Sequence, residues 1–265
     1  GVHISAYSYF EWIKVIFLGM YKVLLDWKKY DFYIAEMGID SPVEPKNMTY
    51  LLKIIRPKIG VLTNISFEHS VYFDPLVKNG VSREEDILSL TAKQETLLLT
   101  SIDIDGTAVL NIDDENIKKI KKDIKAKSLT VSKNSKEADF YIESIKNFVD
   151  EFLMQFKFEG KKYELKIANP LPEHFAYSFL LAIAIAKTSG LEIDESISAL
   201  ESNFSLPPGR MSVFKGIKST ILIDSSYNNA TLTPMLDLLS FVKDIGKQRR
   251  RIGIIGDMRE LGTMS

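Results

Sequence analysis

Two ionisable residues follow apolar segments in the first quarter of the sequence. The segment Asp31 to Gly38 ends on Glu36 and a glycine, and Ile59 to Leu62 is followed by a polar stretch that includes Asn64 and His69. A carboxylate and an imidazole at such positions can hold a metal ion, act as acid and base, or cap the loops that follow. The residues alone leave these three alternatives open.

Both apolar segments are predicted to be strands, because short apolar runs bounded by a proline and by polar residues suit a strand that is buried on both faces. Residues 43–55 between them have helical spacing. A strand–helix–strand unit makes its two strands parallel. Ligands of open parallel sheets bind beyond the carboxyl ends of the strands, so Glu36 and His69 are expected to face one crevice.

Further elements extend this unit. Ser82 and Glu85 form a capping-box signature at the start of a helix that carries Lys93 and reaches Leu99. A strand at 107–110, a helix at 113–125, and helices at 173–189 and 194–203 are also predicted, with Gly190 as a helix cap. Four short segments with strand patterning predict an antiparallel patch with a turn at 159–161, namely 129–131, 140–145, 151–158 and 162–167.

The segment Leu206-Pro-Pro-Gly-Arg210 interrupts regular structure and is predicted to separate two domains. The fold class is therefore α/β, with a mostly parallel sheet, flanking helices and a small antiparallel patch in residues 1–206. Residues 207–265 are predicted to begin a second, Rossmann-like α/β domain. Its expected elements are strands at 211–214, 220–224 and 251–255 and a helix at 233–245.

Composition narrows the classes of function. The hydrophobic content of 45%, the charged content of 26% and the net charge of -1 are those of an ordinary globular protein and argue against a general nucleic-acid binder. The absence of cysteine excludes disulfides, thiolate zinc sites and a cysteine nucleophile. Charged residues interrupt the apolar stretch Tyr9 to Leu25, so an amphipathic helix packed on the sheet is predicted instead of a membrane span.

Four motifs carry a resemblance to a known family. They are Glu36-Met-Gly38, Thr63-Asn-Ile-Ser-Phe-Glu-His69, Ala92-Lys-Gln-Glu95 and Ala108-Val-Leu-Asn-Ile-Asp-Asp114. In order, spacing and residue types they resemble the successive motifs of the central domain of a Mur ligase. Mur ligases are ATP-dependent, amide-forming enzymes of cell-wall peptide assembly, so the resemblance implies this fold and this chemistry.

Motifs in the second half narrow the resemblance. Pro208-Gly-Arg210, Ile223-Asp-Ser-Ser-Tyr-Asn228 and Gly256-Asp-Met-Arg-Glu-Leu-Gly262 are similar to the linker and carboxyl-terminal domain of one branch of the family. That branch adds D-alanyl-D-alanine to a UDP-muramoyl-tripeptide. The resemblance implies these two small-molecule substrates, a cytoplasmic monomer, and no nucleic-acid or membrane partner.

The resemblance implies ATP and Mg²⁺ as cofactors, since magnesium neutralises a triphosphate and prefers oxygen ligands. Glu36 would bind one magnesium, and His69 would bind a second or hold the substrate near it. Lys93 matches a lysine that many members carbamylate, which turns a cation into an anionic oxygen donor. The alternative for Lys93 is an ordinary helix lysine paired with Glu95 or Glu85.

Nucleotide contacts are implied for a second set of residues. Arg210 would reach phosphate from the second domain, a role that suits its planar, always-charged guanidinium; a hinge residue with a local ion pair is the alternative. His174 would border adenine, unless it is only a helix-terminal residue. The other implied nucleotide-binding residues are Asn64, Ser178, Asp224, Ser225, Tyr227 and Asn228.

Several departures from the family pattern bear on these expectations. The phosphate-binding Gly-x-x-x-x-Gly-Lys-Ser/Thr loop is absent; the family places it just upstream of Gly1, so the chain is expected to follow a segment with this loop and not to turn over ATP alone. Ser225 and Ser178 replace a ribose-binding aspartate and an adenine-binding asparagine. Asn228-Asn-Ala-Thr231 replaces the usual Asn-Ala-Asn-Pro.

Two other functions stay open. One is a Mur-like ligase of different specificity, such as a folylpolyglutamate synthase or a pseudomurein peptide ligase. The other is a non-catalytic scaffold of the same fold, which the serines at 178 and 225 would suit.

Overall fold

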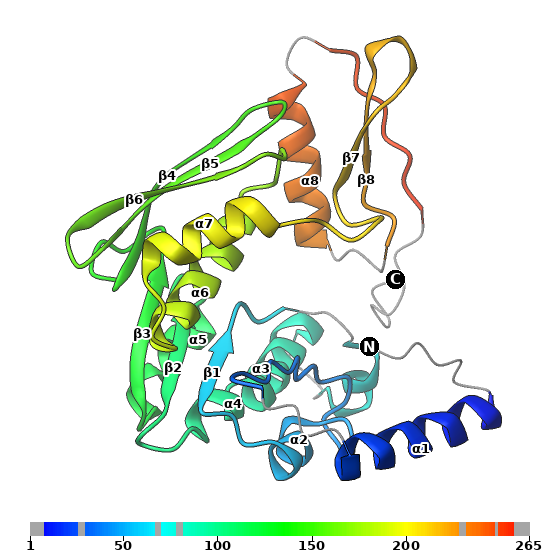
Figure 1. Ribbon diagram of the computed structural model, residues 1–265, viewed down its shortest axis with the longest axis vertical. Coiled ribbons are helices and arrows are strands. Elements are labelled where there is room, and N and C mark those ends of the chain that lie inside the picture. Colours follow the sequence, from blue (N-terminus) through cyan, green and yellow to red (C-terminus); the bar gives the residue numbers. More distant parts are fainter. Residues whose placement is uncertain are drawn as a thin grey trace. The chain divides into compact units, whose positions relative to one another are not determined.

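The computed structural model describes residues 8–25, 30–66, 70–77, 82–227, 232–246 and 249–256. By its contacts the chain divides into two units, residues 1–37 and 38–265, which are described separately (Figure 1). His69 and Asn228, for which ligand-binding roles are expected, lie outside the described residues.

The first unit contains the predicted amino-terminal helix, α1 (Tyr9–Leu25). None of its residues is buried. The predicted strand at 31–38 is wrong: its residues form no regular structure, and Phe32, Tyr33 and Ile34 are 58%, 80% and 91% exposed. A strand is defined by ladder hydrogen bonds to a neighbour, and no strand pairing of the described residues includes this segment.

The second unit is built on a six-stranded sheet whose spatial order equals the chain order. The first four strands are parallel, and the last two add an antiparallel patch to the fourth. The segment 129–131, predicted to belong to that patch, lies instead in the third strand, which is parallel to both of its neighbours. The strands are β1 (Ile59–Leu62), β2 (Thr107–Asn111), β3 (Lys127–Ser132), β4 (Phe140–Asn147), β5 (Phe152–Phe158) and β6 (Lys161–Ile167).

The turn between β5 and β6 is the predicted hairpin. Glu159 and Gly160 have φ values of 47° and 76°. Two consecutive residues with positive φ make a hairpin turn whose twist matches the right-handed twist of the strands. This turn fixes the register in which Phe158 lies opposite Lys161.

The first helices of this unit are shorter than predicted. α2 (Met48–Ile54) begins only after Asn47, whose side chain accepts a hydrogen bond from the Tyr50 amide at 2.9 Å. Ser82 caps the next helix as predicted, accepting from the Glu85 amide at 3.3 Å. That helix divides into α3 (Arg83–Glu95) and α4 (Leu97–Thr100).

The division falls at Thr96, whose hydroxyl donates to the carbonyl of Ala92 at 2.6 Å. Such back-bonding by a threonine bends helices. The short 3₁₀ helix η1 (Ser70–Leu76) precedes α3. The predicted helix at 113–125 is α5 (Glu115–Ile120) followed by η2 (Lys121–Asp123).

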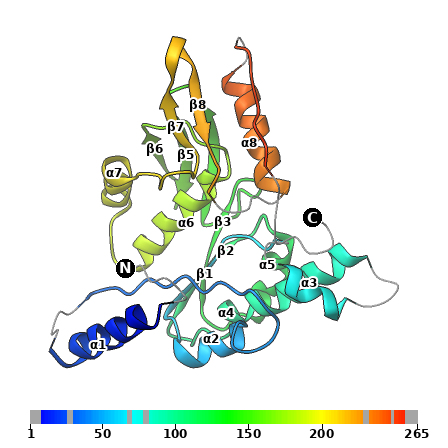
Figure 2. The same ribbon diagram turned by 90° about the vertical axis from the view of Figure 1, so that its right-hand side faces the viewer.

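Helices cover both faces of the parallel strands. Along β2, Val109 belongs to a cluster with α6 (Phe175–Thr188) and α7 (Ile193–Asn203), whereas Ala108 and Leu110 belong to a cluster with α4 and α5. Successive strand residues point to opposite faces, so β2 is buried between two helical layers, an arrangement that can be followed in Figure 2. This explains why its three central residues, Ala108 to Leu110, are apolar.

A second, two-stranded sheet follows residue 206. β7 (Ser212–Lys215) and β8 (Ile221–Asp224) are antiparallel and flank η3 (Ile217–Ser219), and α8 (Leu232–Ile245) follows. The predicted strand at 251–255 is wrong, because residues 249–256 contain no strand and are all exposed. The domain boundary at 206/207 stays a prediction.

The aromatic core of the antiparallel patch generates a stability prediction. Phe156 is fully buried, with its ring centroid 5.3 Å from that of Tyr163. Phe156→Ala should lower the free energy of unfolding by about 3–5 kcal/mol, since it removes a buried ring and leaves a cavity. Urea denaturation measures this. Phe148→Ala is the control, because Phe148 is 45% exposed; an equal loss in both variants would contradict the assignment of the core.

Candidate functional site

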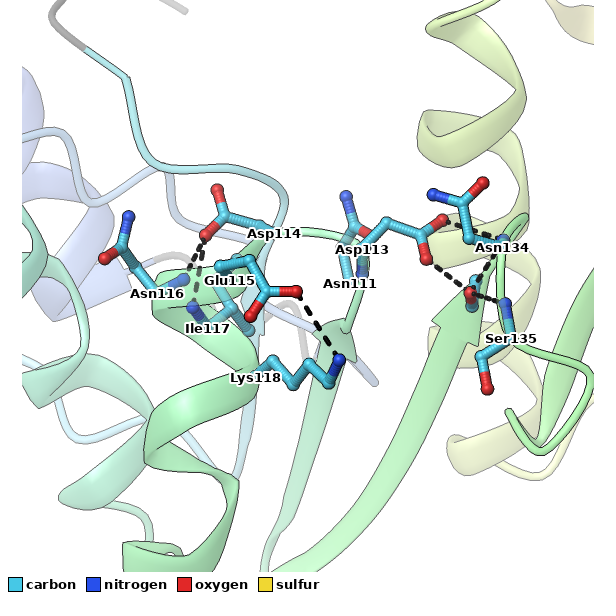
Figure 3. Close-up of polar contacts among 10 residues, drawn as sticks. Asn111, Asp113, Asp114, Glu115, Asn116, Ile117, Lys118, Asn134 and Ser135 are labelled. Atoms are coloured by element: carbon cyan, nitrogen blue, oxygen red, sulfur yellow. Dashed lines mark hydrogen bonds and ion pairs between the residues drawn. The ribbon is translucent and has the colours of Figure 1, made fainter.

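The carboxyl end of β2 continues into a loop, residues 111–114, that holds the end of β1. The Asn111 side-chain amide donates to the carbonyl of Thr63 at 2.8 Å. The carboxylate of Asp114 accepts from the Ile65 amide at 2.8 Å and also caps α5 by accepting from the Asn116 amide. Figure 3 shows Asp114 at the start of that helix. The chain that leaves β1 is therefore held on both sides of Asn64.

Asp113, the neighbour of Asp114, points to the other side and holds the end of β3 (Figure 3). Its carboxylate accepts from the fully buried Ser132 hydroxyl at 2.5 Å and from the Lys133 amide at 2.7 Å. The hydroxyl of Tyr177, on α6, donates to the same carboxylate at 2.8 Å. Two adjacent aspartates thus attach β1, β3 and α6 to the end of β2.

The first turn of α6 carries His174 and Ser178, the residues implied to border adenine. Ser178 is exposed. Nδ1 of His174 lies 3.4 Å from a carboxylate oxygen of Asp237 on α8. Burial lowers the pKa of His174 below its ordinary value, and the attraction of Asp237 opposes this shift. The His174 side chain is still 43% exposed, so solvent screens these effects on stability.

The linker that contains Arg210 packs against the loop after β8. The Tyr227 amide donates to the carbonyl of Gly209 at 3.0 Å, and the guanidinium carbon of Arg210 lies 4.7 Å from the centre of the Tyr227 ring. A guanidinium over an aromatic face is attracted by the ring electrons. Arg210 is thereby kept beside Tyr227, one of the implied nucleotide residues.

Asp224 ends β8 and stabilises that loop. Its carboxylate accepts from the Ser226 amide at 3.0 Å, and hydrogen bonds from Ser226 lower the pKa of Asp224. The side chain therefore stays ionised near neutral pH, as a carboxylate that accepts hydrogen bonds from ribose would have to be. Ser225 is half-buried.

The residues implied to bind metal fall in different parts of the chain, with Glu36 in the first unit, Lys93 in the second and His69 outside the described residues. Lys93 lies on α3 and is exposed. Glu36 belongs to the other unit and is exposed. In the residues that are described, no three histidine, aspartate or glutamate side chains form a cluster that could hold a metal.

Two buried side-chain oxygens on α3 are relevant to whether this helix could help to bind a metal ion. Within the part of the chain that the structure describes, the Thr91 hydroxyl and the Gln94 side-chain oxygen have no hydrogen-bond partner, and Thr91 is only 3% exposed. Buried polar atoms are normally bonded. Magnesium takes oxygen ligands, commonly one or two carboxylates plus water, and Thr91 and Gln94 add two neutral oxygens to the helix that carries Lys93.

No role was predicted for Asn111, Asp113, Asp114 or Tyr177, although the first three lie within a motif that carried the family resemblance. One local signal was available. An aspartate directly before a helix is a strong N-cap residue, which predicts the bond from Asp114 to α5. Nothing local predicts the partners of Asp113.

Comparison with known proteins decides the family. The family model described as the Mur ligase middle domain matches residues 17–186, which is more than half of the chain. This chain belongs to the Mur ligase family. No helix within the described part of this Mur ligase chain is long and apolar enough to cross a membrane.

The chain is similar to two curated proteins named UDP-N-acetylmuramoyl-tripeptide--D-alanyl-D-alanine ligase. The protein from Synechocystis sp. is 25% identical over 247 residues, which cover 92% of this chain and 48% of the relative. The protein from Rickettsia prowazekii is 24% identical and covers 89% of this chain and 49% of the relative. The chain therefore spans about half the length of these relatives.

A solved structure shows the same fold. The MurF ligase from Thermotoga maritima, solved in complex with ADP, has a TM-score of 0.64 and 20% identity, over 82% of this chain and 45% of that protein. The likeness confirms the predicted fold class: the mixed, mostly parallel sheet of a Mur ligase middle domain.

The contact between Gly209 and Tyr227 in this Mur ligase chain generates a prediction. A Cβ at Gly209 would lie 2.9 Å from Cβ of Tyr227 and the backbone φ is +76°. Gly209→Ala should therefore lower the free energy of unfolding by more than about 1 kcal/mol. Gly160→Ala is a matched control, because Gly160 also has φ +76° but no atom lies within 4 Å of its Cβ position. Equal losses by chemical denaturation would contradict the contact.

The His174–Asp237 contact generates a second prediction. An NMR titration should give His174 a pKa below 6.5, and Asp237→Asn should lower that pKa further, since it removes the attraction that favours the imidazolium. A folded-state pKa below the unfolded value means that this contribution to stability is present above pH 6.5 and is lost as the pH falls through the folded pKa. The three histidines permit assignment by single substitution. A higher pKa in Asp237→Asn would contradict the contact.

Proposed function

We propose that this chain is the ATP-binding part of a ligase that joins D-alanyl-D-alanine to a UDP-muramoyl-tripeptide. The observation that carries the proposal is the match of the Mur ligase middle domain over residues 17–186. Two relatives of about 25% identity, named for this reaction, support the specificity.

The reaction has two steps. A substrate carboxylate oxygen attacks the terminal phosphorus of ATP, forming an acyl phosphate with release of ADP. The amine of the dipeptide then attacks the acyl carbon, loses its proton, and releases inorganic phosphate as the amide bond forms. Phosphoryl transfer of this kind depends mainly on positioning and on neutralising charge, so the chain has to supply aligned donors and cations.

Roles in this reaction are proposed for individual residues. Bound magnesium neutralises phosphate charge, and Glu36, His69 and a carbamylated Lys93 would hold it. Arg210 would contact phosphate after leaving the ring of Tyr227, since a guanidinium binds phosphate through paired N–H donors.

The base and ribose would be held by the remaining candidates. Asn64 extends from the end of β1, and His174 and Ser178 lie on the first turn of α6. Asp224, Ser225, Tyr227 and Asn228 follow β8 and would contact ribose. We assign residues 1–206 to the central domain and residues 207–265 to the beginning of the carboxyl-terminal domain, and place the reaction in the cytoplasm with the protein acting as a monomer.

Phosphate release by the product of the complete gene tests the proposal. With ATP, magnesium and UDP-muramoyl-tripeptide, release should depend on added D-alanyl-D-alanine. Release that requires a different amino acceptor would assign another specificity within the family. No release with any acceptor would overturn the proposal and favour a non-catalytic scaffold.

Lys93→Ala sharpens this test. Removing a group that stabilises charge in the transition state lowers turnover by roughly a hundredfold or more. We expect Lys93→Ala to slow phosphate release by this factor. Lys119→Ala is the control, because Lys119 is also an exposed helix lysine. Unchanged turnover in Lys93→Ala would remove Lys93 from the proposed metal site.

A further inference from the structure

The contacts that position α6 are of two kinds. Its buried residues are apolar, among them Ala176, Phe179, Leu180 and Ile183. Apolar packing is non-directional, so it holds α6 against the sheet but specifies the rotation of the helix weakly. Polar contacts at the first turn have a defined direction and can set that rotation.

The bond from Tyr177 to Asp113 is the best-defined of these polar contacts. The hydroxyl donates to the carboxylate at 2.8 Å across 64 residues of sequence. Burial raises the pKa of Tyr177, and the hydrogen bond to Asp113 adds to the shift. The phenol therefore stays protonated and remains a donor at physiological pH. A bond to a charged acceptor is also stronger than one between neutral groups.

The acceptor in this bond is itself held in place. The Asp113 carboxylate receives bonds from the Ser132 hydroxyl and the amides of Lys133 and Asn134, all at the end of β3 (Figure 3). Tyr177 is thus bonded to a carboxylate that is itself fixed to β3, so the carboxylate cannot shift to accommodate a movement of the tyrosine. An ion pair between Lys133 and Glu173 ties the residue just before the helix to the same part of β3.

Tyr177 shares one helical turn with His174 and Ser178. A turn contains 3.6 residues, so a change in rotation or axial position at Tyr177 displaces both neighbours. We propose that Tyr177 and Asp113 are a positioning pair that holds the first turn of α6 in the orientation that binds the base end of the nucleotide. This inference rests on the proposed function, in which His174 and Ser178 border the base.

The pair can be removed without disturbing the rest of the loop. Asn111 and Asp114 bind the backbone of Thr63 and Ile65, and among the described residues neither side chain is hydrogen-bonded to Tyr177. Tyr177→Phe deletes a single hydroxyl and leaves the ring, the Asp113–Ser132 bond and the attachment of β1. Its effect should therefore fall on the base end of the nucleotide site and spare the remainder.

The experiment compares steady-state kinetics of Tyr177→Phe and wild type, in the product of the complete gene. The KM for ATP should rise about tenfold, the effect of losing one charged hydrogen bond, while kcat stays within about twofold. Inhibition by inorganic tripolyphosphate, which has no base, should be unchanged. A merely structural defect would change both kinetic constants and the tripolyphosphate inhibition together.

Thr130→Val is the matched control. The buried Thr130 hydroxyl donates to the Asp139 carboxylate at 2.6 Å and accepts from the Asp139 amide at 2.9 Å, so the variant also deletes a hydroxyl–carboxylate bond, but one outside the loop at 111–114. Its KM for ATP should equal that of wild type. A rise in KM equal to that of Tyr177→Phe would overturn the inference.

Titration of ADP by calorimetry separates this inference from the proposed reaction. If the wild type binds ADP but shows no acceptor-dependent release, the proposed reaction fails and about tenfold weaker ADP binding by Tyr177→Phe still supports the pair. Equal ADP affinity in the two proteins overturns the pair even if the reaction is confirmed. Failure of the wild type to bind ADP overturns both.

Discussion

Hydrogen bonds from the loop at 111–114 join the ends of three strands and one helix, and the geometry of the candidate site depends on them. Among the described strands, β1 is a four-residue edge strand with a ladder partner on one side only. Asn111 and Asp114 extend its attachment past the last ladder pair by binding the backbone of the residues that follow. Asp113 does the same for β3 and α6. Without these bonds the carboxyl edge of the sheet would be a set of independent loops.

Stability and orientation come from different interactions in this protein. Fully burying one large apolar side chain contributes about 1.5–3 kcal/mol, whereas a typical hydrogen bond adds about 1 kcal/mol net. The buried phenylalanines of β4 and β5 and the apolar face of α6 therefore dominate the free energy of folding. The bonds around Asp113 contribute less free energy, but they are directional, and so they decide where the residues of the first turn of α6 lie.

In the linker that contains Gly209 and Arg210, weak contacts likewise set the orientation of a side chain while adding little stability. Gly209 permits a close backbone approach to Tyr227 that any side chain would block, and the Arg210 guanidinium then rests on the Tyr227 ring. Both side chains are exposed, so the contact is weak enough to be exchanged for a phosphate. A side chain that is positioned by weak contacts can move to a ligand at little cost in free energy.

The sequence by itself determined the elements whose signals are local. Periodicity and turn chemistry predicted β2, the turn at Glu159 and Gly160, the Ser82 cap, and α6, and they were confirmed because each depends on residues within a few positions. The same reasoning failed at 31–38 and 251–255, where apolar runs have no pairing partner among the described residues. Only the tertiary structure gave the two adjacent aspartates their different partners. Asp114 binds an amide 49 residues away and Asp113 a hydroxyl 64 residues away, and no local pattern encodes contacts that exist only after the strands have paired.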